Sequence, residues 1–272
     1  MCNKGEQKMN KVIAFQTSIF GNYGNIVPDP EIMMNILSDL KQEQFIPGTV
    51  DVAKLDLATR RLTSEARMSF VKTDKTWKII FLEERIDFNY EYQKGTDEFY
   101  ISQLFEYSRL LIEKIFKVFS ATTGFRLGIN CNIHITKLNI DEEKTPYGEN
   151  LILPIYKKEN DAHLRHWATS SVTEINIPIN EKKEICNHRV EISQILGKET
   201  DEQEGSDNDG IDIEFPMIAN EDLGIGLVKA EFDINTLAEK REERFCPDDL
   251  VYFSKETQKY MEQSIQYLEG NL

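Results

Sequence analysis

Apolar and polar residues alternate most strictly between residues 77 and 92, and this alternation predicts a β-hairpin. The apolar positions of the first arm are Trp77, Ile79 and Phe81, and those of the second arm are Ile86, Phe88, Tyr90 and Tyr92. A period of two over β-branched and aromatic residues is typical of strands with one buried face. The polar pair Glu83-Glu84 between the arms suits the turn.

The residues before this hairpin continue the pattern of strands. Val12 to Ile19 predicts a first strand, and Asp29-Pro30 predicts a helix start, because Asp can cap a helix and Pro fits its first turn. Residues Thr49 to Tyr92 predict an antiparallel meander of four strands. The apolar positions change parity after Val52, which predicts a β-bulge.

A long helix is predicted next, over about residues 97–121. Its apolar residues advance by threes and fours along one broad face: Ile101, Leu104, Phe105, Ser108, Leu111, Ile112, Ile115 and Phe119. We expect this helix to cover the meander. Gly124 stands where a left-handed C-terminal cap would be expected.

Phe125 to Thr136 predicts a strand with one apolar and one polar face. The odd positions form an apolar face of Phe125, Leu127, Ile129, Cys131, Ile133 and Ile135, and the even positions carry Arg126, Gly128, Asn130, Asn132, His134 and Thr136. Such a division indicates that one face is buried and that the other is wet or lines a groove.

The remainder of the chain predicts further strands and a final helix. Strands are expected at 172–179, 185–196, 211–215 and 227–234, a short strand or helix at 151–156, and a helix that begins near Pro247 or Ser254. Residues 199–214 are rich in acids and contain no Lys or Arg, which predicts a mobile loop.

Strands therefore occur in blocks, which predicts an α+β fold with mainly antiparallel sheet, one long covering helix at about 97–121 and a C-terminal helix. We expect a single α+β domain over 1–272. The alternative is two halves, with the meander and the long helix in 9–140, and the second strand block with the C-terminal helix in 141–272.

The net charge of −15 argues against a general nucleic-acid binder, because binding phosphates needs clustered Lys and Arg. No apolar run is long enough to span a bilayer, and the first residues lack the apolar core of a signal peptide. The four scattered cysteines have the pattern of reduced thiols. We therefore expect an acidic, cytoplasmic protein without a membrane partner.

Three stretches resemble a family of uncharacterised, sporadically distributed bacterial proteins. They are the hairpin with Trp77, Phe81, Glu84, Arg85, Ile86, Asp87 and Phe88, the strand Phe125 to Asn130, and the late strand Phe232 to Ile234 followed by a terminal helix. The chain departs from the family pattern at Asn130 to Ile133, where an aromatic residue before Asn is more usual. The resemblance implies a bacterial source and the same order of elements, and it implies no established reaction.

Three pairs of histidine and cysteine residues suggest a zinc site at first sight: Cys131 with His134, His163 with His166, and Cys186 with His188. On a strand, Cys131 and His134 point to opposite faces, and none of the pairs has the close paired spacing typical of zinc sites. The acidic run lacks the first ligand of a calcium loop, because Gly205 stands there. We therefore expect neither a metal nor a cofactor.

The polar sides of two predicted strands supply a partner or ligand face. Its residues are Arg85, Asp87, Arg126, Asn130, Asn132 and His134. If the two strands are neighbours, these side chains could form a polar cleft. The alternative, which we favour, is that they pair with one another across the sheet.

We interpret the chain as a non-enzymatic protein-interaction subunit or sensor component of a bacterial multi-protein system. Its expected partner is another protein, encoded in the same operon, and a homo-oligomer is an alternative. A different class of function is a metal-dependent or acid/base enzyme with a polar cleft built from His163, His166, His188 and Asp87. A third, which rests on the family resemblance alone, is a component of a defence or toxin-associated system.

Overall fold

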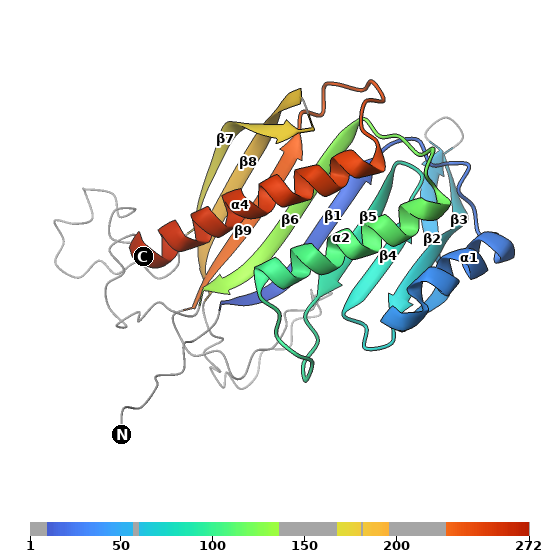
Figure 1. Ribbon diagram of the computed structural model, residues 1–272, viewed down its shortest axis with the longest axis horizontal. Helices are drawn as coiled ribbons and strands as arrows, with labels where there is room; N and C mark the ends of the chain where they lie inside the picture. The colour runs from blue at the N-terminus through green and yellow to red at the C-terminus, as the bar shows by residue number, and fades with distance from the viewer. Residues whose placement is uncertain (1–9, 57–59, 136–167, 181, 196–226, 272) are drawn as a thin grey trace, which may run out of the picture.

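The computed structural model describes residues 10–56, 60–135, 168–180, 182–195 and 227–271. It is an α+β fold with one nine-stranded antiparallel sheet (Figure 1). The described strands and helices are β1 (Lys11–Phe20), α1 (Pro30–Leu40), β2 (Phe45–Asp56), β3 (Arg61–Lys72), β4 (Trp77–Phe81), β5 (Arg85–Glu91), α2 (Ile101–Val118), β6 (Arg126–Ile135), β7 (Ala168–Ile179), β8 (Lys182–Ile195), β9 (Leu227–Thr236) and α4 (Pro247–Asn271), with a 3-10 turn, η1 (Lys41–Glu43), after α1. The spatial order of the strands is β2-β3-β4-β5-β1-β6-β9-β8-β7.

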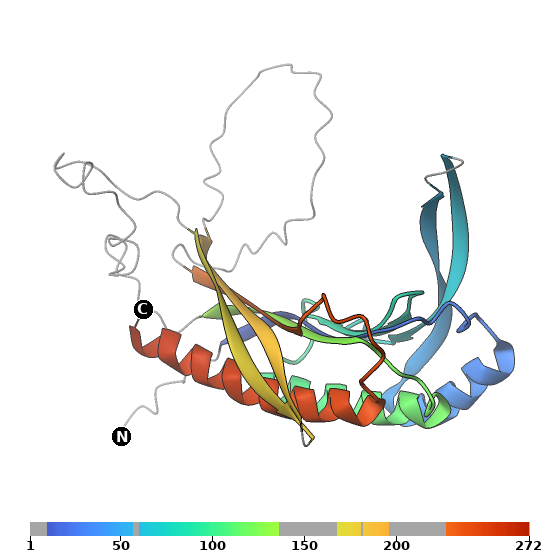
Figure 2. The same ribbon diagram turned by 90° about the horizontal axis from the view of Figure 1, so that it is seen from above.

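The three described α-helices lie on one side of the sheet, as Figure 2 shows. α2 and α4 pack against each other, and the Arg109 guanidinium on α2 donates a hydrogen bond of 3.0 Å to Gln258 Oε1 on α4. The β2–β3 hairpin turns away from this helix layer. We expected one long helix to cover the sheet, whereas α2 and α4 both cover it and α1 lies on the same side. The longer of them is α4, with 25 residues against 18 in α2.

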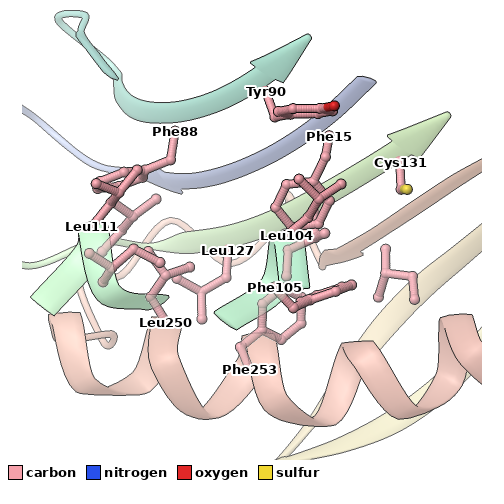
Figure 3. Packing of buried hydrophobic residues seen from close by; sticks show 14 of the residues in the cluster. Phe15, Phe88, Tyr90, Leu104, Phe105, Leu111, Leu127, Cys131, Leu250 and Phe253 are labelled. Atoms are coloured by element: carbon pink, nitrogen blue, oxygen red, sulfur yellow. The ribbon is translucent and has the colours of Figure 1, made fainter. Parts of the chain in front are cut away.

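The core fills the space between the sheet and the helices (Figure 3). The aromatic rings of Phe15 on β1 and Phe105 on α2 meet edge to face with centroids 4.8 Å apart. Trp77 is 1 % exposed and contacts the rings of Tyr90 and Tyr107. Each large apolar side chain buried in this way contributes about 1.5–3 kcal/mol. The alternation predicted for 77–92 therefore places its apolar residues toward the helices, as expected.

Local signals explain where the first two helices begin. Asp29 Oδ1 accepts a hydrogen bond of 2.9 Å from the Ile32 amide, which confirms Asp29 as the cap of α1. α2 begins at Ile101, four residues later than predicted, because the Gln103 side chain reaches back and accepts from the Tyr100 amide at 2.8 Å. The acids at Asp97 and Glu98 precede the helix and are not part of its first turn.

Two backbone predictions were wrong. β2 pairs with β3 in one unbroken register from Phe45 opposite Lys72 to Asp56 opposite Arg61, so the hairpin has no bulge. Gly124 is not a left-handed cap, because α2 ends at Val118 and Gly124 does not have a positive φ. A Cβ atom there would lie 2.6 Å from a side-chain carbon of Ile19, so close packing requires the glycine. Gly124 pairs with Phe245, the residue two positions before α4.

The sheet is built from two similar halves. β1, β3, β4, β5 and α2 correspond in order and position to β6, β7, β8, β9 and α4, and the central pair is β1 with β6. α1 and β2 are additional elements of the first half. β6 therefore opens the second half, and the boundary of the repeat lies close to residue 120 and not near 140.

Register and sequence support this repeat. Asp87 lies opposite Ser18 in the β1–β5 pair, and Asp233 lies opposite Asn130 in the β6–β9 pair. Ile86-Asp87-Phe88-Asn89 corresponds to Phe232-Asp233-Ile234-Asn235. The spacing from Asp87 to the buried Ser108 (108 − 87 = 21) equals the spacing from Asp233 to the buried Ser254 (254 − 233 = 21). The two strand-and-helix units therefore align without a gap.

Several predicted features lie outside the described residues. These are the element at 151–156, His163, His166, the acidic run at 199–214 and the strand at 211–215. Among the described helices, none has the length and apolar character needed to cross a membrane.

Candidate binding face

We call the sheet surface opposite the helices the open face, because no described helix lies on it (Figure 2). Successive side chains on a strand point to opposite sides, so the residues between the buried ones form this surface. On the central strands it carries Gln16, Ser18 and Phe20 from β1, Arg85, Asp87 and Asn89 from β5, Arg126, Asn130, Asn132 and His134 from β6, and Asp233 and Asn235 from β9.

All six predicted face residues lie on this one surface. β5 and β6 are not neighbours, however, because β1 lies between them. Arg85, Arg126 and Asn130 line one small depression of about 70 Å³ with Phe20 between the two guanidinium groups. The central carbon of the Arg85 guanidinium lies 6.0 Å from the centre of the Phe20 ring, and that of Arg126 lies 4.9 Å from it. Both arginines thus lie within cation–π distance of Phe20.

Each charged group of this depression has a partner on its own or a neighbouring strand. The Arg85 Nε atom lies 2.9 Å from Asp87 Oδ2, and Asp87 also accepts a hydrogen bond of 2.7 Å from the Ser18 hydroxyl. Arg126 donates to Asn235 Oδ1 at 2.6 Å. The predicted residues therefore form bonds across the sheet, but with β1 and β9 and not between β5 and β6.

Asp87 is 2 % exposed, and burial raises the pKa of its carboxyl above the ordinary value. Hydrogen bonds from Ser18 and Gln16 and the charge of Arg85 act in the opposite direction. The carboxylate is thus held by three neighbours at the centre of the face.

A wider depression of about 480 Å³ adjoins the first one. It is lined on β1, β4, β5 and β6 by side chains that include Gln16, Lys78, Ile80, Asn89, Asn130 and Asn132. Four of the lining side chains carry amides, beside apolar residues such as Ile13, Val71 and Ile80. Each amide can donate and accept hydrogen bonds, so the surface suits a partner with many polar groups.

β6 carries three buried polar atoms without a hydrogen-bond partner, and all three belong to side chains of the open face. They are Arg126 Nε, Asn132 Oδ1 and His134 Nδ1. Buried polar atoms in folded proteins are nearly always paired, and an unpaired one costs about 1–3 kcal/mol. Three on one strand face indicate groups that a bound partner could satisfy.

His134 lies at the far end of β6, opposite Lys11 on β1 and Lys229 on β9. Burial lowers the pKa of His134 to about 4, and the two lysine charges act in the same direction. The imidazole is therefore neutral at neutral pH.

The residues of the proposed metal or acid/base cleft do not come together in the described part of the chain. Asp87 lies on the open face, whereas His188 and Cys186 share the helix side of β8. Cys131 and His134 point to opposite faces of β6, as predicted. Within the described residues no group of three or more His, Cys, Asp or Glu side chains could hold a metal ion.

The sequence interpretation missed Gln16, Phe20, Asp233 and Asn235. Gln16 and Phe20 fall on the polar parity of the first predicted strand. Asp233 and Asn235 repeat the Asp-x-Asn pattern of Asp87 and Asn89, so a search for internal repeats could have found them. Comparison of the chain with protein-family models, with curated proteins and with solved structures found no match.

Proposed function

We propose that this protein is a non-enzymatic binding module and that its open face holds another protein. The observation that carries the proposal is the set of three unpaired buried polar atoms on Arg126, Asn132 and His134. A bound polypeptide supplies backbone and side-chain donors and acceptors that could pair with them. In this proposal the chain is the cytoplasmic component of a bacterial multi-protein system, and its partner is encoded beside it.

The size of the face supports a protein-sized partner. The six strands β4-β5-β1-β6-β9-β8 give five spacings of ~4.8 Å, or ~24 Å, across the sheet. Ten residues of strand at ~3.3 Å each give ~33 Å along it. The product is ~800 Å², which is about the area that one partner contributes to a standard protein–protein interface.

The charges of the face support a protein and not a nucleic acid. Four strands each carry an ion pair between residues two apart on the open face: Glu65 with Arg67, Arg85 with Asp87, Arg189 with Glu191, and Lys229 with Glu231. These four basic groups are thus already paired with acids of the same strand. Binding of phosphates draws on unneutralised clusters of Lys and Arg.

The proposal is tested by a bulky change at the centre of the face. Asn130→Arg adds a long charged side chain between the two depressions, and Gln266→Arg makes the same change at an exposed position of α4. Proteins captured by each tagged variant in the cells that naturally produce the chain are quantified by mass spectrometry. We expect Asn130→Arg to lose at least one partner that the native chain and Gln266→Arg both retain, with melting temperatures unchanged. Identical partners for all three chains would refute the role of the face.

A further inference from the structure

A second site lies on the helix side of the sheet, at the far edge of the second half. A cavity of about 630 Å³ lies between the turn that joins β7 to β8 and the first turns of α4. Its described lining includes Ile179, Lys182, Glu184, Arg244, Phe245 and Tyr252. This volume is within the range of about 300–1,000 Å³ that small-molecule sites occupy.

Arg244 lines this cavity, and one edge of its guanidinium has no hydrogen-bond partner. Its Nη1 atom donates to two backbone carbonyls, those of Phe125 at 2.7 Å and Lys240 at 2.9 Å, and its guanidinium stacks on the Phe245 ring with 4.4 Å to the ring centre. The Nε and Nη2 atoms are buried and have no hydrogen-bond partner. These two atoms form the side of a guanidinium that can hold a carboxylate or phosphate through two parallel hydrogen bonds.

Glu184 is the acid nearest to this edge, yet it does not saturate it. Glu184 Oε2 lies 3.6 Å from Arg244 Nη2, which is too far for a good hydrogen bond, and 3.3 Å from Lys240 Nζ. Two cations thus share one carboxylate. The basic Lys182 adds a further positive charge to the lining.

The rest of the lining combines the apolar or aromatic Ile179, Phe245 and Tyr252 with Asn180 and Asp249, and the Asn180 amide donates a hydrogen bond to the Asp249 carboxylate. Ile179 and Phe245 are buried at the base of the cavity, and Tyr252 is 46 % exposed. An exposed aromatic ring beside a fixed guanidinium suits a ligand that combines a flat or apolar body with an anionic group.

The two halves differ in side-chain size at the position two residues after Glu184, which lines this cavity. Tyr90 in the first half and Thr236 in the second occupy the same place in the repeat. Tyr90 is three residues after Asp87, and Thr236 is three residues after Asp233. Tyr90 lies opposite Trp77, and Thr236 lies opposite Cys186. The buried Trp77 ring packs on Tyr107 of α2 with centroids 5.1 Å apart, whereas Cys186 is far smaller. The second half therefore has small residues where the first half has a packed pair of large aromatic residues.

We propose that this cavity binds a small organic oxyanion, with its carboxylate or phosphate on the Nε/Nη2 edge of Arg244 and its apolar part against Ile179 and Tyr252. The anion replaces the loose contact with Glu184, which keeps its pairing with Lys240. The site is separate from the open face, because Glu184 shares the helix side of β8 with Cys186. Failure of anion binding at this cavity would therefore leave the proposed protein partner untouched, and failure of the protein partner would leave the anion site untouched.

The test uses the full chain and three probes: benzoate, phenyl phosphate and the neutral benzamide. Each is titrated to millimolar concentration while the side-chain Nε–H signal of Arg244 is followed by nuclear magnetic resonance. We expect both anions to shift that signal saturably and benzamide to leave it in place. The relative affinities of benzoate and phenyl phosphate show which oxyanion the site prefers.

Four variants sharpen the result. Arg244→Lys removes the two-pronged edge and should weaken anion binding by about tenfold or more, the factor expected for one lost charge-assisted hydrogen bond. Glu184→Gln removes the competing carboxylate and should tighten binding by about fivefold or more. Tyr252→Ala should weaken it, and Arg241→Lys, the same change at an exposed position outside the lining, should have no effect.

If Arg244→Lys fails to fold because it loses an anchor to Phe125, Glu184→Gln and Tyr252→Ala still decide the question in the native chain. The proposal is overturned if neither anion binds, if benzamide binds as tightly as the anions, or if affinity is unchanged in Glu184→Gln and Tyr252→Ala.

Discussion

The two halves of the sheet have the same strand order but carry different side chains on the helix side. In the first half a Trp and a Tyr face each other on β4 and β5, and the ring of Tyr107 closes over them. In the second half a Cys and a Thr stand in those places, both fully buried, and the cavity of about 630 Å³ is lined by Glu184, two residues before that Cys. The comparison shows that strand order and helix placement set the architecture. The size of the buried side chains at corresponding places then differs between the halves.

The halves also differ in how their outer edges are held. In the first half the buried Arg67 on β3 lies 3.2–3.4 Å from the carbonyl oxygens of Tyr23, Gly24 and Ile26, and so fixes the loop between β1 and α1. The outermost strand of the second half, β7, is exposed over most of its first seven residues, as at Val172 with 63 % exposure. Arg67 thus fixes a loop against β3, the strand next to the edge, whereas the edge strand of the first half, β2, is itself exposed, as at Ile46 with 56 % exposure.

The largest effect is expected from the aromatic pair. Trp77→Ala removes a fully buried ring from the first half and should lower the free energy of unfolding by about 3–5 kcal/mol. Cys186→Ala removes a single sulfur atom at the corresponding place and should cost about 1 kcal/mol. Urea unfolding followed by circular dichroism measures both. Equal costs would mean that the two positions are equally packed.

A second difference should appear as pH falls, because both described histidines, His134 and His188, belong to the second half. The folded pKa of His134 is about 4, below the unfolded value of about 6.5. Between these values the unfolded chain binds a proton that the folded chain does not, so stability is lost as pH falls from 6.5 toward 4. The lowered pKa corresponds to a loss of about 2–3 kcal/mol.

His134→Gln keeps a polar side chain without a titratable group, and should remove that part of the loss. The free energy of unfolding is measured from pH 7 to pH 4.5 for both chains. Parallel curves would show that His134 is as easily protonated in the folded chain as in the unfolded one. Lys78→Gln, a change at a half-buried residue that lines the wider depression, serves as a control on the open face.

Much of the architecture followed from periodicity. The hairpin at 77–92, the strand from Phe125 and the cap at Asp29 were all confirmed, because each depends on residues close together in the sequence. The bulge in β2 was wrong, because β2 lies in a hairpin that turns away from the helices, where Val52 need not share a buried face with its neighbours.

The candidate sites followed from sequence only in part. The six predicted face residues share one surface, because parity along a strand decides which side a residue faces. That β1 separates β5 from β6 could not be foreseen, since pairing order depends on contacts between distant strands. The cavity at Arg244 brings the β7–β8 turn together with a loop and a helix that follow it more than 60 residues later in the chain (244 − 182 = 62). No local pattern in the sequence marks it.

The smallest effects concern two buried serines that the repeat places in corresponding positions, Ser108 on α2 and Ser254 on α4. The Ser108 hydroxyl donates a hydrogen bond of 3.1 Å to Thr17 Oγ1 on β1. Ser254 Oγ has no partner. The β6 residue opposite Thr17 in the central ladder is Ile129, which has no polar side-chain atom to offer.

Ser108→Ala should therefore cost about 1–3 kcal/mol, because it leaves the buried Thr17 hydroxyl unpaired. Ser254→Ala removes a buried hydroxyl that pairs with nothing, so it should be neutral within about 0.5 kcal/mol or slightly stabilising. The double change Ser108→Ala with Thr17→Val removes both partners and should recover part of the loss, since no donor is then left buried alone. Denaturant unfolding of the three variants measures the difference. A cost at Ser254 equal to that at Ser108 would show that the second hydroxyl also has a partner, and that the two halves are more alike at their centre than at their edges.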